Sequence, residues 1–573
     1  MILHVLACDY DGTIADHGVL SPETAAMLGR VRDSGRKLFL VTGRMLDDLK
    51  RTCPDVDRLF DLVVAENGGL LYVPERREVR RLGDAPEPAL VEALQRRGVP
   101  LDVGASILAT TADFSEAALA AIRETGVERS LVFNKGSLML LPGGVTKGTG
   151  LTAALDAAQL SAHNLAGIGD AENDHAFLSM CECAVAVADA VPALRERADI
   201  VTAASGAAGA REFIEEHVLP DIPDLAPRLK RHDIKIGEDS AATPVTVGAH
   251  CTHLLVVGPS GSGKTTLTVA LVEQLVDSGR TTCLIDPEGD YHTLSEFPRV
   301  VAMGGKGEHA LPTPDELGQL LGRPGDSLVL DLSALSRPEK VTYTTKVLAT
   351  ANAVRGSRGM PHWLVIDEAH HIFPADGSQA VELLPAGMES FCLITLGVDD
   401  LPREITERVN TIASTDLDSF RKATERVFGH YVHGLRLPTG APLERGEAAI
   451  AWRDADRPAV RFRVSPRRME HRRHVRKYTE GELPPERSFF FRGPENALNL
   501  RAANLVRFVE LAEGVDEATW THHLRAGDYS RWARDKIKDP ELADEIRGVE
   551  PLDLPPSESR PRVLDAIRNR YAV

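Results

Sequence analysis

A glycine-rich loop between a strand-like and a helix-like segment constrains this chain more than any other feature. Leu254–Val257 is a short apolar run with β-branched residues, and Thr266–Val276 places apolar residues at helical spacing. The loop between them, Gly258–Thr265, fits the Walker A pattern G-x-x-x-x-G-K-[ST]. Strand, loop and helix in this order predict a parallel α/β sheet with an anion-binding loop at the start of a helix.

The residue types of this loop indicate a nucleotide site. Glycines let the backbone curl so that its N–H groups surround a phosphate. Lys264 would reach the β- and γ-phosphates of ATP, and Thr265 would offer its hydroxyl to Mg²⁺. The residues expected to bind ATP are Gly258, Gly261, Ser262, Gly263, Lys264, Thr265 and Thr266. The alternative is a Gly/Ser-rich turn without a ligand, and the flanking strand and helix favour the nucleotide site.

Composition limits the class of protein. The 573 residues are 43% hydrophobic and 26% charged, which is typical of a globular chain of several domains. The net charge of −18 provides no global attraction to nucleic acid, although a local basic patch could bind it. Seven scattered cysteines without a C-x-x-C pair argue against a zinc site and a disulfide framework. No apolar run reaches the roughly 18 residues of a membrane span, so we expect a cytoplasmic protein without membrane contact.

Polar motifs follow three strand-like segments within residues 1–215. Asp9 and Asp11 come directly after the first strand, Thr42 after the second and Asp170 after the third. Active sites of open α/β sheets lie at the carboxyl ends of the strands, so these side chains are expected in one cleft. The strands are expected at Ile2–Ala7, Lys37–Val41 and Ala166–Ile168.

The order of these motifs resembles that of the haloacid dehalogenase (HAD) phosphatases, in the branch that includes the Cof-type and sugar-phosphate phosphatases. The resemblance covers residues 1–215. It is carried by Asp9-x-Asp11-Gly-Thr, Thr42-Gly-Arg44, Glu66-Asn67-Gly68, Lys147-Gly148 and Gly169-Asp170-x-x-Asn173-Asp174.

This resemblance implies a role for each motif residue. Asp9 would be the nucleophile that forms an aspartyl-phosphate, and Asp11 would serve as general acid and then general base. Thr42 and Lys147 would bind and neutralise the transferring phosphoryl group. Oxygen ligands suit Mg²⁺. The implied metal-site residues are Asp9, Asp11 through its backbone carbonyl, Asp170 and the nearby Asp174.

Residues 83–142 are expected to form a small α/β cap over this site. Helices are expected at Pro86–Arg97 and Ser115–Thr125, and strands at Ser106–Thr110, Ser130–Phe133 and Ser137–Leu141. The cap is similar in size to that of archaeal phosphoglycolate phosphatases. The expected substrate is a phosphorylated small molecule, with a two-carbon phosphoacid such as phosphoglycolate ahead of a sugar phosphate.

A proline-rich linker at 216–250 leads to the Walker A domain at 250–465. His362–Ile366 is an apolar strand that ends in Asp367-Glu368, the Walker B arrangement. Asp367 would hold Mg²⁺ together with Thr265, and Glu368 would polarise the attacking water.

The motif Asp286-Pro-Glu-Gly-Asp-Tyr291, one strand after the Walker A loop, resembles the HerA/FtsK group of P-loop ATPases. These are usually ring-forming motors that act on DNA or peptides, so the resemblance implies ATP as a ligand, with nucleic acid and a homo-hexamer as candidate partners. After the strand Phe391–Ile394 the group usually carries Thr-Gln, whereas this chain has Thr395-Leu396. The missing glutamine puts nucleotide-coupled translocation in doubt. Arg403 and Arg408 are candidates for a finger across a subunit boundary, with solvated charges as the favoured interpretation.

Residues 466–573 are expected to form a basic connector and a helical C-terminal domain. The basic run 467–477 could contact nucleic acid, but a solvated connector is favoured because it lacks interleaved aromatic residues. Phe489–Phe491 is expected to pack against the ATPase core. Helices are expected at Leu500–Ala512, Glu517–Ala526 and Tyr529–Lys536, with Trp520 and Trp532 as anchors.

The fold class is therefore α/β: a Rossmann-like HAD domain with a small cap, a RecA-like P-loop domain and a helical C-terminal region. The leading functional hypothesis joins an Mg²⁺-dependent phosphomonoester hydrolase to an ATP-hydrolysing domain. One alternative is a polynucleotide or small-molecule kinase–phosphatase, against which Glu368 weighs because kinases usually lack it. The other is a nucleotide-controlled DNA-binding or oligomerisation module with vestigial catalysis.

Overall fold

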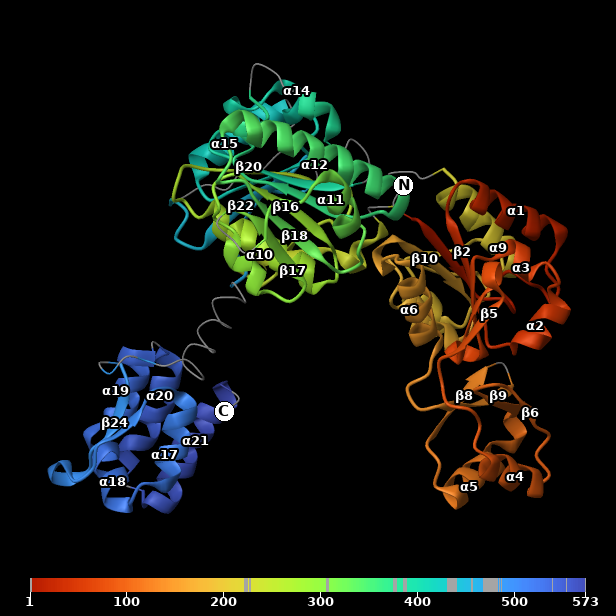
Figure 1. Cartoon of the computed structure of the whole chain (residues 1–573), viewed down its shortest axis with the longest axis horizontal. Helices are drawn as coiled ribbons and strands as arrows, with labels where there is room; N and C mark the ends of the chain where they lie inside the picture. The colour runs from red at the N-terminus through yellow and green to blue at the C-terminus, as the bar shows by residue number, and fades with distance from the viewer. Residues whose placement is uncertain are drawn as a thin grey trace. The chain divides into compact units, whose positions relative to one another are not determined.

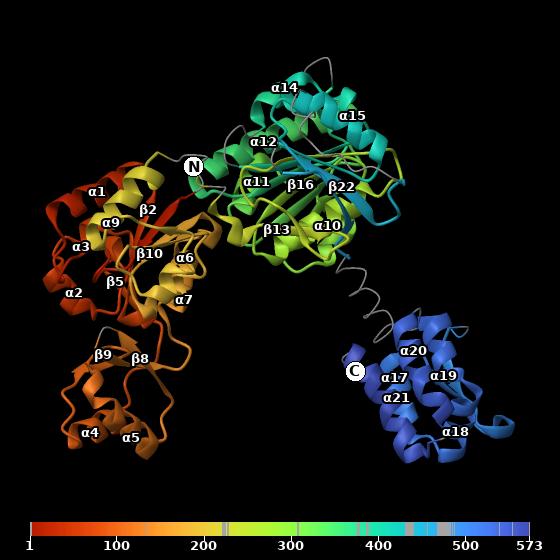
Figure 2. The ribbon, with the colours of Figure 1, turned by 180° about the vertical axis from the view of Figure 1, so that it is seen from behind.

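The computed structural model of the chain divides into two compact units, Met1–Ser465 and Pro466–Val573, each of which is described by itself (Figures 1 and 2). The first unit contains an N-terminal domain with its cap and a central domain. The structure describes residues 3–134, 136–220, 225, 228–305, 309–374, 379–384, 389–429, 441–454, 457–466, 483, 485, 487–537, 539–552 and 554–571.

The N-terminal domain is built on an eight-stranded sheet in the order β12-β11-β10-β1-β2-β3-β4-β5. The strands from β12 to β3 are parallel, and β4 and β5 are antiparallel. Helices α1 and α9 cover one face and α6 the other (Figure 1), which explains why β1 and β3 are apolar and buried along their whole length. The bounds are β1 Val5–Cys8, β2 Lys37–Val41, β3 Leu62–Ala65, β4 Leu70–Val73, β5 Glu78–Arg81, β10 Leu165–Gly169, β11 Cys183–Ala186, β12 Ile200–Val201, α1 Pro22–Asp33, α6 Lys147–Ala158 and α9 Gly206–Phe213.

The cap is a four-stranded antiparallel sheet, ordered β6-β7-β9-β8, with two helices on one face. Both ribbon views place α4 and α5 on the side of this sheet that faces away from the N-terminal domain (Figures 1 and 2). The second helix begins and ends where the sequence predicts, and β6 is an additional short strand. The bounds are α4 Pro88–Arg96, β6 Asp102–Val103, β7 Leu108–Thr111, α5 Ser115–Thr125, β8 Arg129–Asn134 and β9 Ser137–Pro142.

The central domain contains an eleven-stranded sheet in the order β14-β13-β23-β22-β21-β15-β20-β19-β16-β18-β17. Strands β21 to β17 in this order are parallel, and the others join antiparallel at one edge. Helices α10 and α12 cover opposite faces (Figures 1 and 2). The bounds are β13 Ile234–Glu238, β14 Pro244–Val247, β15 His253–Val257, α10 Lys264–Asp277, β16 Thr282–Asp286, β17 Val300–Gly304, α11 Pro314–Leu321, β18 Ser327–Asp331, α12 Arg337–Arg358, β19 Trp363–Ile366, β20 Ser390–Thr395, β21 Thr411–Ser414, β22 Glu447–Trp452 and β23 Val460–Val464. The expected α/β architecture is thus confirmed in both domains.

A buried ionic cluster joins the N-terminal domain to the central domain. The carboxylate of Glu182 is fully buried and lies 2.7 Å from His163 Nδ1, 2.6 Å from His250 Nε2 and 2.7 Å from an Arg280 amino group. His163 also contacts the carbonyl oxygen of Ser278, at the end of α10, at 2.7 Å. Burial raises the pKa of Glu182, but His250 and Arg280 outweigh this effect and hold the pKa well below its usual range.

The C-terminal unit has its own hydrophobic core, and two expectations about it are wrong. Phe489–Phe491 forms β24 and packs within this core against Phe508 and Trp532, not against the ATPase core. Residues 500–502 form β25, paired with β24, because the aromatic strand needs a partner for its backbone groups. The bounds are β25 Leu500–Ala502, α17 Leu505–Gly514, α18 Glu517–Ala526, α19 Asp528–Trp532, α20 Pro540–Val549 and α21 Pro556–Tyr571.

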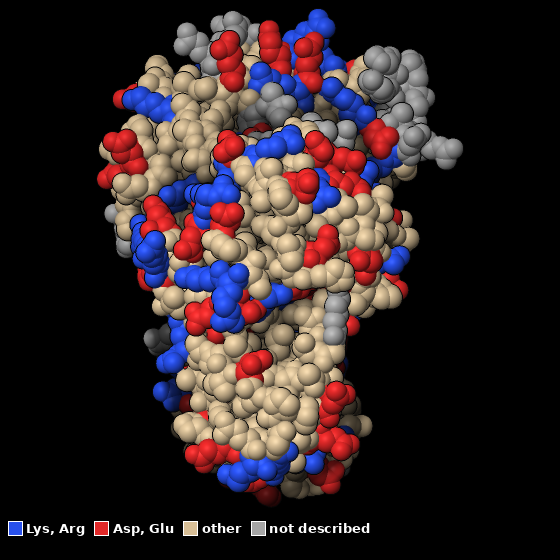
Figure 3. Space-filling view, turned by 90° about the vertical axis from the view of Figure 1, so that its right-hand side faces the viewer, with Lys and Arg blue, Asp and Glu red and all other residues tan. Residues whose placement is uncertain are grey.

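Two further expectations concern a basic connector and membrane spans. The basic run 467–477 lies outside the described residues. On the face shown in Figure 3, basic and acidic side chains are interspersed. Within the described ranges, every helix is too short or too polar to cross a bilayer.

Candidate active site

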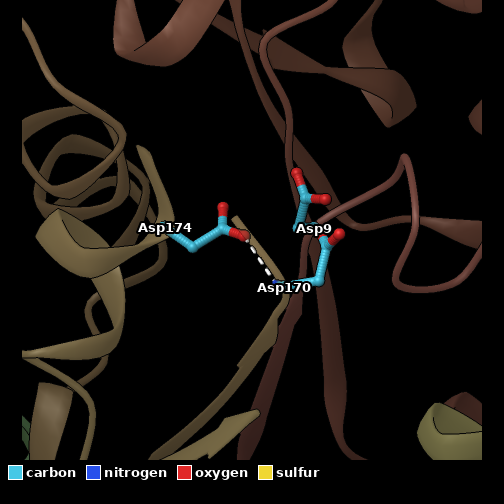
Figure 4. A group of neighbouring side chains, drawn as sticks. All are labelled: Asp9, Asp170 and Asp174. Atoms are coloured by element: carbon cyan, nitrogen blue, oxygen red, sulfur yellow. Dashed lines mark hydrogen bonds between the residues drawn. The ribbon is translucent and has the colours of Figure 1, made fainter. Parts of the chain in front are cut away.

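The candidate active site lies where three neighbouring parallel strands of the N-terminal sheet end. Strand β1 is flanked by β10 and β2, so the residues that follow these strands meet at one edge. Asp9 follows β1, Asp170 follows β10 and Thr42 follows β2, and all three are almost fully buried. Figure 4 shows the carboxylates of Asp9 and Asp170 side by side, with Asp174 directed toward them.

Lys147 reaches this cluster from the first turn of α6. Its Nζ donates to Asp9 Oδ1 at 2.5 Å and to Asp174 Oδ1 at 2.6 Å, and its side chain is 1% exposed. The helix begins at Lys147 because the Thr146 hydroxyl accepts a hydrogen bond from the Thr149 N–H. Gly68 has φ of +102°, and a Cβ there would lie 1.9 Å from the carbonyl oxygen of Thr146. A glycine at position 68 therefore allows the start of α6 to approach the sheet closely.

Hydrogen bonds from Asp174 and Thr13 hold the cluster in place. Asp174 Oδ2 accepts hydrogen bonds from the backbone N–H groups of Asp170 and Ala171, both at 2.9 Å. The hydroxyl of Thr13 lies 3.0 Å from Asp170 Oδ1 and 3.3 Å from Asp9 Oδ2. Asp174 thus orients both Asp170 and Lys147. The role of Thr13 was not predicted, although it is the last residue of the D-x-D-G-T motif.

The electrostatics of the cluster fit a divalent cation. Ligand oxygens of Asp9, Asp170 and Asp174 lie within 4.8 Å of one another. Burial raises the pKa of Asp9 well above its usual range and Asp174 adds to this, while Lys147 opposes it. Burial lowers the pKa of Lys147, but Asp174 and Asp9 outweigh this and raise it above its ordinary value. Three buried carboxylates face one ammonium group, and hard oxygen donors with excess negative charge suit Mg²⁺.

Asp11 is directed toward a partner that the sequence reasoning did not identify. Both of its carboxylate oxygens accept hydrogen bonds at 2.7 Å from Arg44, through Nε and one amino group. Arg44 also donates to Asp48 at 2.7 Å, so its guanidinium is held in a fixed orientation. Donation of a proton to a leaving group requires Asp11 to separate from Arg44. The Thr42-Gly-Arg44 motif was recognised in the sequence, but it gave no sign of this pairing.

The Walker A loop has the backbone that its pattern predicts. It runs from the end of β15 to the start of α10, and Gly261 and Gly263 adopt φ of +74° and +106°. Lys264 is buried and donates to the carbonyl oxygens of Gly258 and Pro259 at 2.9 and 3.0 Å. Burial lowers the pKa of Lys264, and the nearby Glu368 and Asp367 oppose this.

The Walker B residues follow β19, which is separated from the strand before the Walker A loop by a single strand. Strand β20 separates β15 from β19, so Thr395 at its end stands between the Walker A loop and Asp367. Burial raises the pKa of Asp367 to about 7. His370 Nδ1 lies 3.3 Å from the Thr395 hydroxyl and 3.4 Å from a Glu368 oxygen. This histidine therefore connects the candidate water-polarising carboxylate to the candidate sensor threonine.

The two arginines considered as fingers have partners within the chain. Arg403 is exposed and pairs with Glu407 one helical turn away at 2.7 Å. Arg408 donates to the carbonyl oxygen of Leu384 at 2.6 Å.

Comparisons with known proteins agree with the two-domain organisation. Residues 6–92 and 105–214 match the haloacid dehalogenase-like hydrolase family, and residues 234–353 match the central domain of helicase HerA. Phosphoglycolate phosphatase of Methanothermobacter thermautotrophicus is 33% identical over 37% of this chain and 97% of its own length. The phosphoglycolate phosphatase of Halorubrum lacusprofundi is 32% identical over 35% of this chain and 91% of its own length. That of Haloarcula marismortui is 31% identical over 36% of this chain and 95% of its own length.

The chain covers these relatives almost completely, and the residues that match the hydrolase family contain the carboxylate cluster. The chain belongs to the haloacid dehalogenase-like hydrolases through its N-terminal domain, which is fused to a domain that matches the central domain of helicase HerA.

Proposed function

We propose that the N-terminal domain hydrolyses a small phosphomonoester with the help of Mg²⁺, and that the central domain binds and hydrolyses ATP. The observation that supports the first activity best is the position of Lys147, whose Nζ lies between Asp9 and Asp174 at the edge of the sheet. A buried cation beside a carboxylate nucleophile can neutralise the charge of an incoming phosphoryl group.

The proposed reaction has two displacement steps. An Asp9 oxygen attacks phosphorus, the bond from phosphorus to the leaving oxygen breaks, and Asp11 supplies the proton that this oxygen needs. Asp11 then takes a proton from water as the water oxygen attacks the aspartyl-phosphate, which releases phosphate and restores Asp9. Lys147 and the Thr42 hydroxyl hold the phosphoryl oxygens during both steps.

Asp9, Asp170 and the backbone carbonyl of Asp11 would hold Mg²⁺, with Asp174 behind them. The bound cation would offset negative charge on the phosphoryl oxygens. The curated relatives act on phosphoglycolate by name, and this supports a two-carbon phosphoacid as the substrate.

Phosphate release from 2-phosphoglycolate tests this proposal, measured with Mg²⁺ and with excess chelator. Asp9→Asn keeps the shape of the side chain but removes its nucleophilic charge. Hydrolysis is expected to depend on Mg²⁺ and to fall to background in this variant. Mg²⁺-dependent hydrolysis that persists in Asp9→Asn would contradict the assignment of the nucleophile.

ATP hydrolysis by the central domain is supported by the arrangement around β15. The Walker A loop, the acidic pair Asp367-Glu368 and Thr395 lie at the ends of adjacent strands. Glu368→Gln should retain ATP binding and lose turnover, because the amide cannot polarise water as the carboxylate does. Transfer of the γ-phosphate to a DNA 5′ end would favour the kinase alternative instead. Binding of nucleic acid and assembly into a hexamer stay predictions of the HerA resemblance.

A further inference from the structure

The cap sheet presents two different faces because side chains alternate along a strand. On β9, Leu138 and Leu140 belong to the cap's own core under α4 and α5. Met139 and Leu141 belong to a second apolar cluster on the opposite face, with Ile107. Since the helices lie on the far side of the sheet, this second face is turned toward the phosphatase domain (Figures 1 and 2).

Met139 extends from this face to the residues that follow β2. Its terminal methyl group lies 3.1 Å from the position that a Cβ on Gly43 would occupy. Its sulfur lies 2.6 Å from Asn67 Nδ2, and the backbone N–H of Asn67 donates to the carbonyl oxygen of Thr42 at 3.1 Å. The methionine therefore covers the backbone next to Thr42, one of the proposed phosphoryl-binding residues. It is 9% exposed.

Glu66 fixes the cap segment over the phosphatase domain. Its buried carboxylate accepts hydrogen bonds from the backbone N–H groups of Ala105, Ser106 and Ile107 at 3.0, 2.8 and 3.3 Å. Arg129 at the start of β8 donates to the carbonyl oxygen of Ser106 at 2.7 Å. The three bonds to Glu66 attach the segment before β7 to the loop that contains Asn67, and the Arg129 bond joins this segment to β8. The position of Met139 is therefore defined by polar anchors as well as by apolar packing.

A polar wall lies beside Met139. Asn173 Nδ2 donates to Asn67 Oδ1 at 2.9 Å, and the turn at 172–174 packs against cap strand β8. Asn173 Oδ1 is buried and has no hydrogen-bond partner among the described residues. Buried amide groups normally have partners for both of their polar atoms. A polar group on a bound substrate can supply the partner that is lacking here.

We propose that Met139 is a specificity-determining residue that restricts the phosphatase to phosphomonoesters with short, polar leaving groups. The inference rests on the proposed phosphatase activity and defines its substrate class. Methionine adapts its shape readily, but a leaving group larger than a few atoms would have to displace its sulfur and methyl group from Asn67 and Gly43.

The test compares 2-phosphoglycolate with p-nitrophenyl phosphate, assayed with Mg²⁺ in the full-length protein. Met139→Ala removes the Cγ, Sδ and Cε atoms and opens the space beside Gly43. The ratio of kcat/KM for the aromatic ester to kcat/KM for phosphoglycolate should rise by at least about tenfold, as expected when steric exclusion of a bulky group is relieved. Met139→Thr should also raise this ratio. Threonine is well suited to a strand, so this variant provides the test if the Met139→Ala protein does not fold.

Two control variants separate this role from general loosening of the cap. Leu140→Ala is the matched control, because Leu140 lies next to Met139 on β9 but faces the cap helices. It should lower thermal stability and leave the substrate ratio within about threefold. Met139→Leu conserves volume and should also keep the ratio near the wild-type value.

The outcomes distinguish the inference from the proposed function. Suppose that wild type hydrolyses phosphoglycolate but that the substrate ratio in Met139→Ala and Met139→Thr equals the ratio in wild type or in Leu140→Ala. The specificity role of Met139 is then wrong, and the phosphatase assignment stands. If wild type hydrolyses neither ester in the presence of Mg²⁺, both are overturned.

Discussion

Replacement of Glu182 by glutamine should weaken the N-terminal and central domains together. Glutamine keeps the size of the side chain but removes its charge, so the buried guanidinium of Arg280 loses its anionic partner. The two side chains are 0% and 1% exposed. Removal of one partner from a buried ion pair costs about 3–5 kcal/mol. His163 and His250 add to the effect because both rings also contact this carboxylate.

The matched control is Glu215→Gln, which removes a charge from the same domain at an exposed pair. Glu215 lies 3.4 Å from Arg30, with side chains 63% and 55% exposed, so its loss should cost less than about 1 kcal/mol. Hydrogen exchange measured by mass spectrometry at increasing urea reports each domain separately, through peptides from β10 and β16. At an m-value of about 3 kcal/mol/M, Glu182→Gln should lower the urea midpoint of both strands by about 1–2 M.

The effect of Glu182 should also depend on pH. Its pKa in the folded protein is held well below the ordinary value of 4.5. Its stabilising contribution is therefore fully present above pH 4.5 and is lost as the pH falls through the lower folded value. The difference between wild type and Glu182→Gln should shrink in that acidic range. A midpoint for Glu182→Gln equal to that of Glu215→Gln at neutral pH, or opening of β10 and β16 at different urea concentrations in wild type, would refute the reasoning.

Three further variants give distinct expectations. Lys147→Met leaves the buried carboxylates without their cation and should lower kcat/KM for phosphoglycolate by about 10²–10³-fold in steady-state assays. An unchanged kcat/KM would exclude a role of Lys147 in phosphoryl binding. Arg44→Ala removes the two hydrogen bonds that orient the Asp11 carboxylate before it separates from Arg44 to transfer a proton. Loss of this orientation should lower kcat by up to about 10²-fold with little change in KM, whereas a change in KM alone would indicate a role in substrate binding. Lys264→Ala should weaken ATP binding by at least about tenfold in calorimetric titrations, while the release of phosphate from 2-phosphoglycolate by the N-terminal domain stays unchanged. An unchanged affinity for ATP would contradict the nucleotide site.

Local patterns predicted those features that depend on neighbouring residues in the chain. The strand Lys37–Val41 and the helix Glu517–Ala526 begin and end where periodicity placed them. Asp9, Thr42 and Asp170 meet because parallel strands bring their carboxyl ends to one edge, so motif order alone indicated their proximity. The glycines of the Walker A loop were expected to let the backbone curl, and Gly261 and Gly263 adopt left-handed conformations in the structure.

Features that depend on distant residues could not be predicted in this way. Glu182 and Arg280 are 98 positions apart, and a charged residue between two apolar segments gives no sign of whether it is buried. Phe489–Phe491 was assigned to the wrong core because aromatic composition predicts burial but not the partner. Met139 looked like an ordinary strand residue, since its contact with Asn67 joins segments that are 72 positions apart.

The most direct test of the phosphoryl-transfer mechanism is chemical trapping of the intermediate. Enzyme quenched during turnover of 2-phosphoglycolate with Mg²⁺ and treated with borohydride should carry a reduced side chain at Asp9, identified by peptide mass spectrometry. Asp9→Asn and chelator-treated enzyme should show no such product. Wild-type enzyme that turns over without modification of Asp9, or with the modification on another carboxylate, would contradict the mechanism.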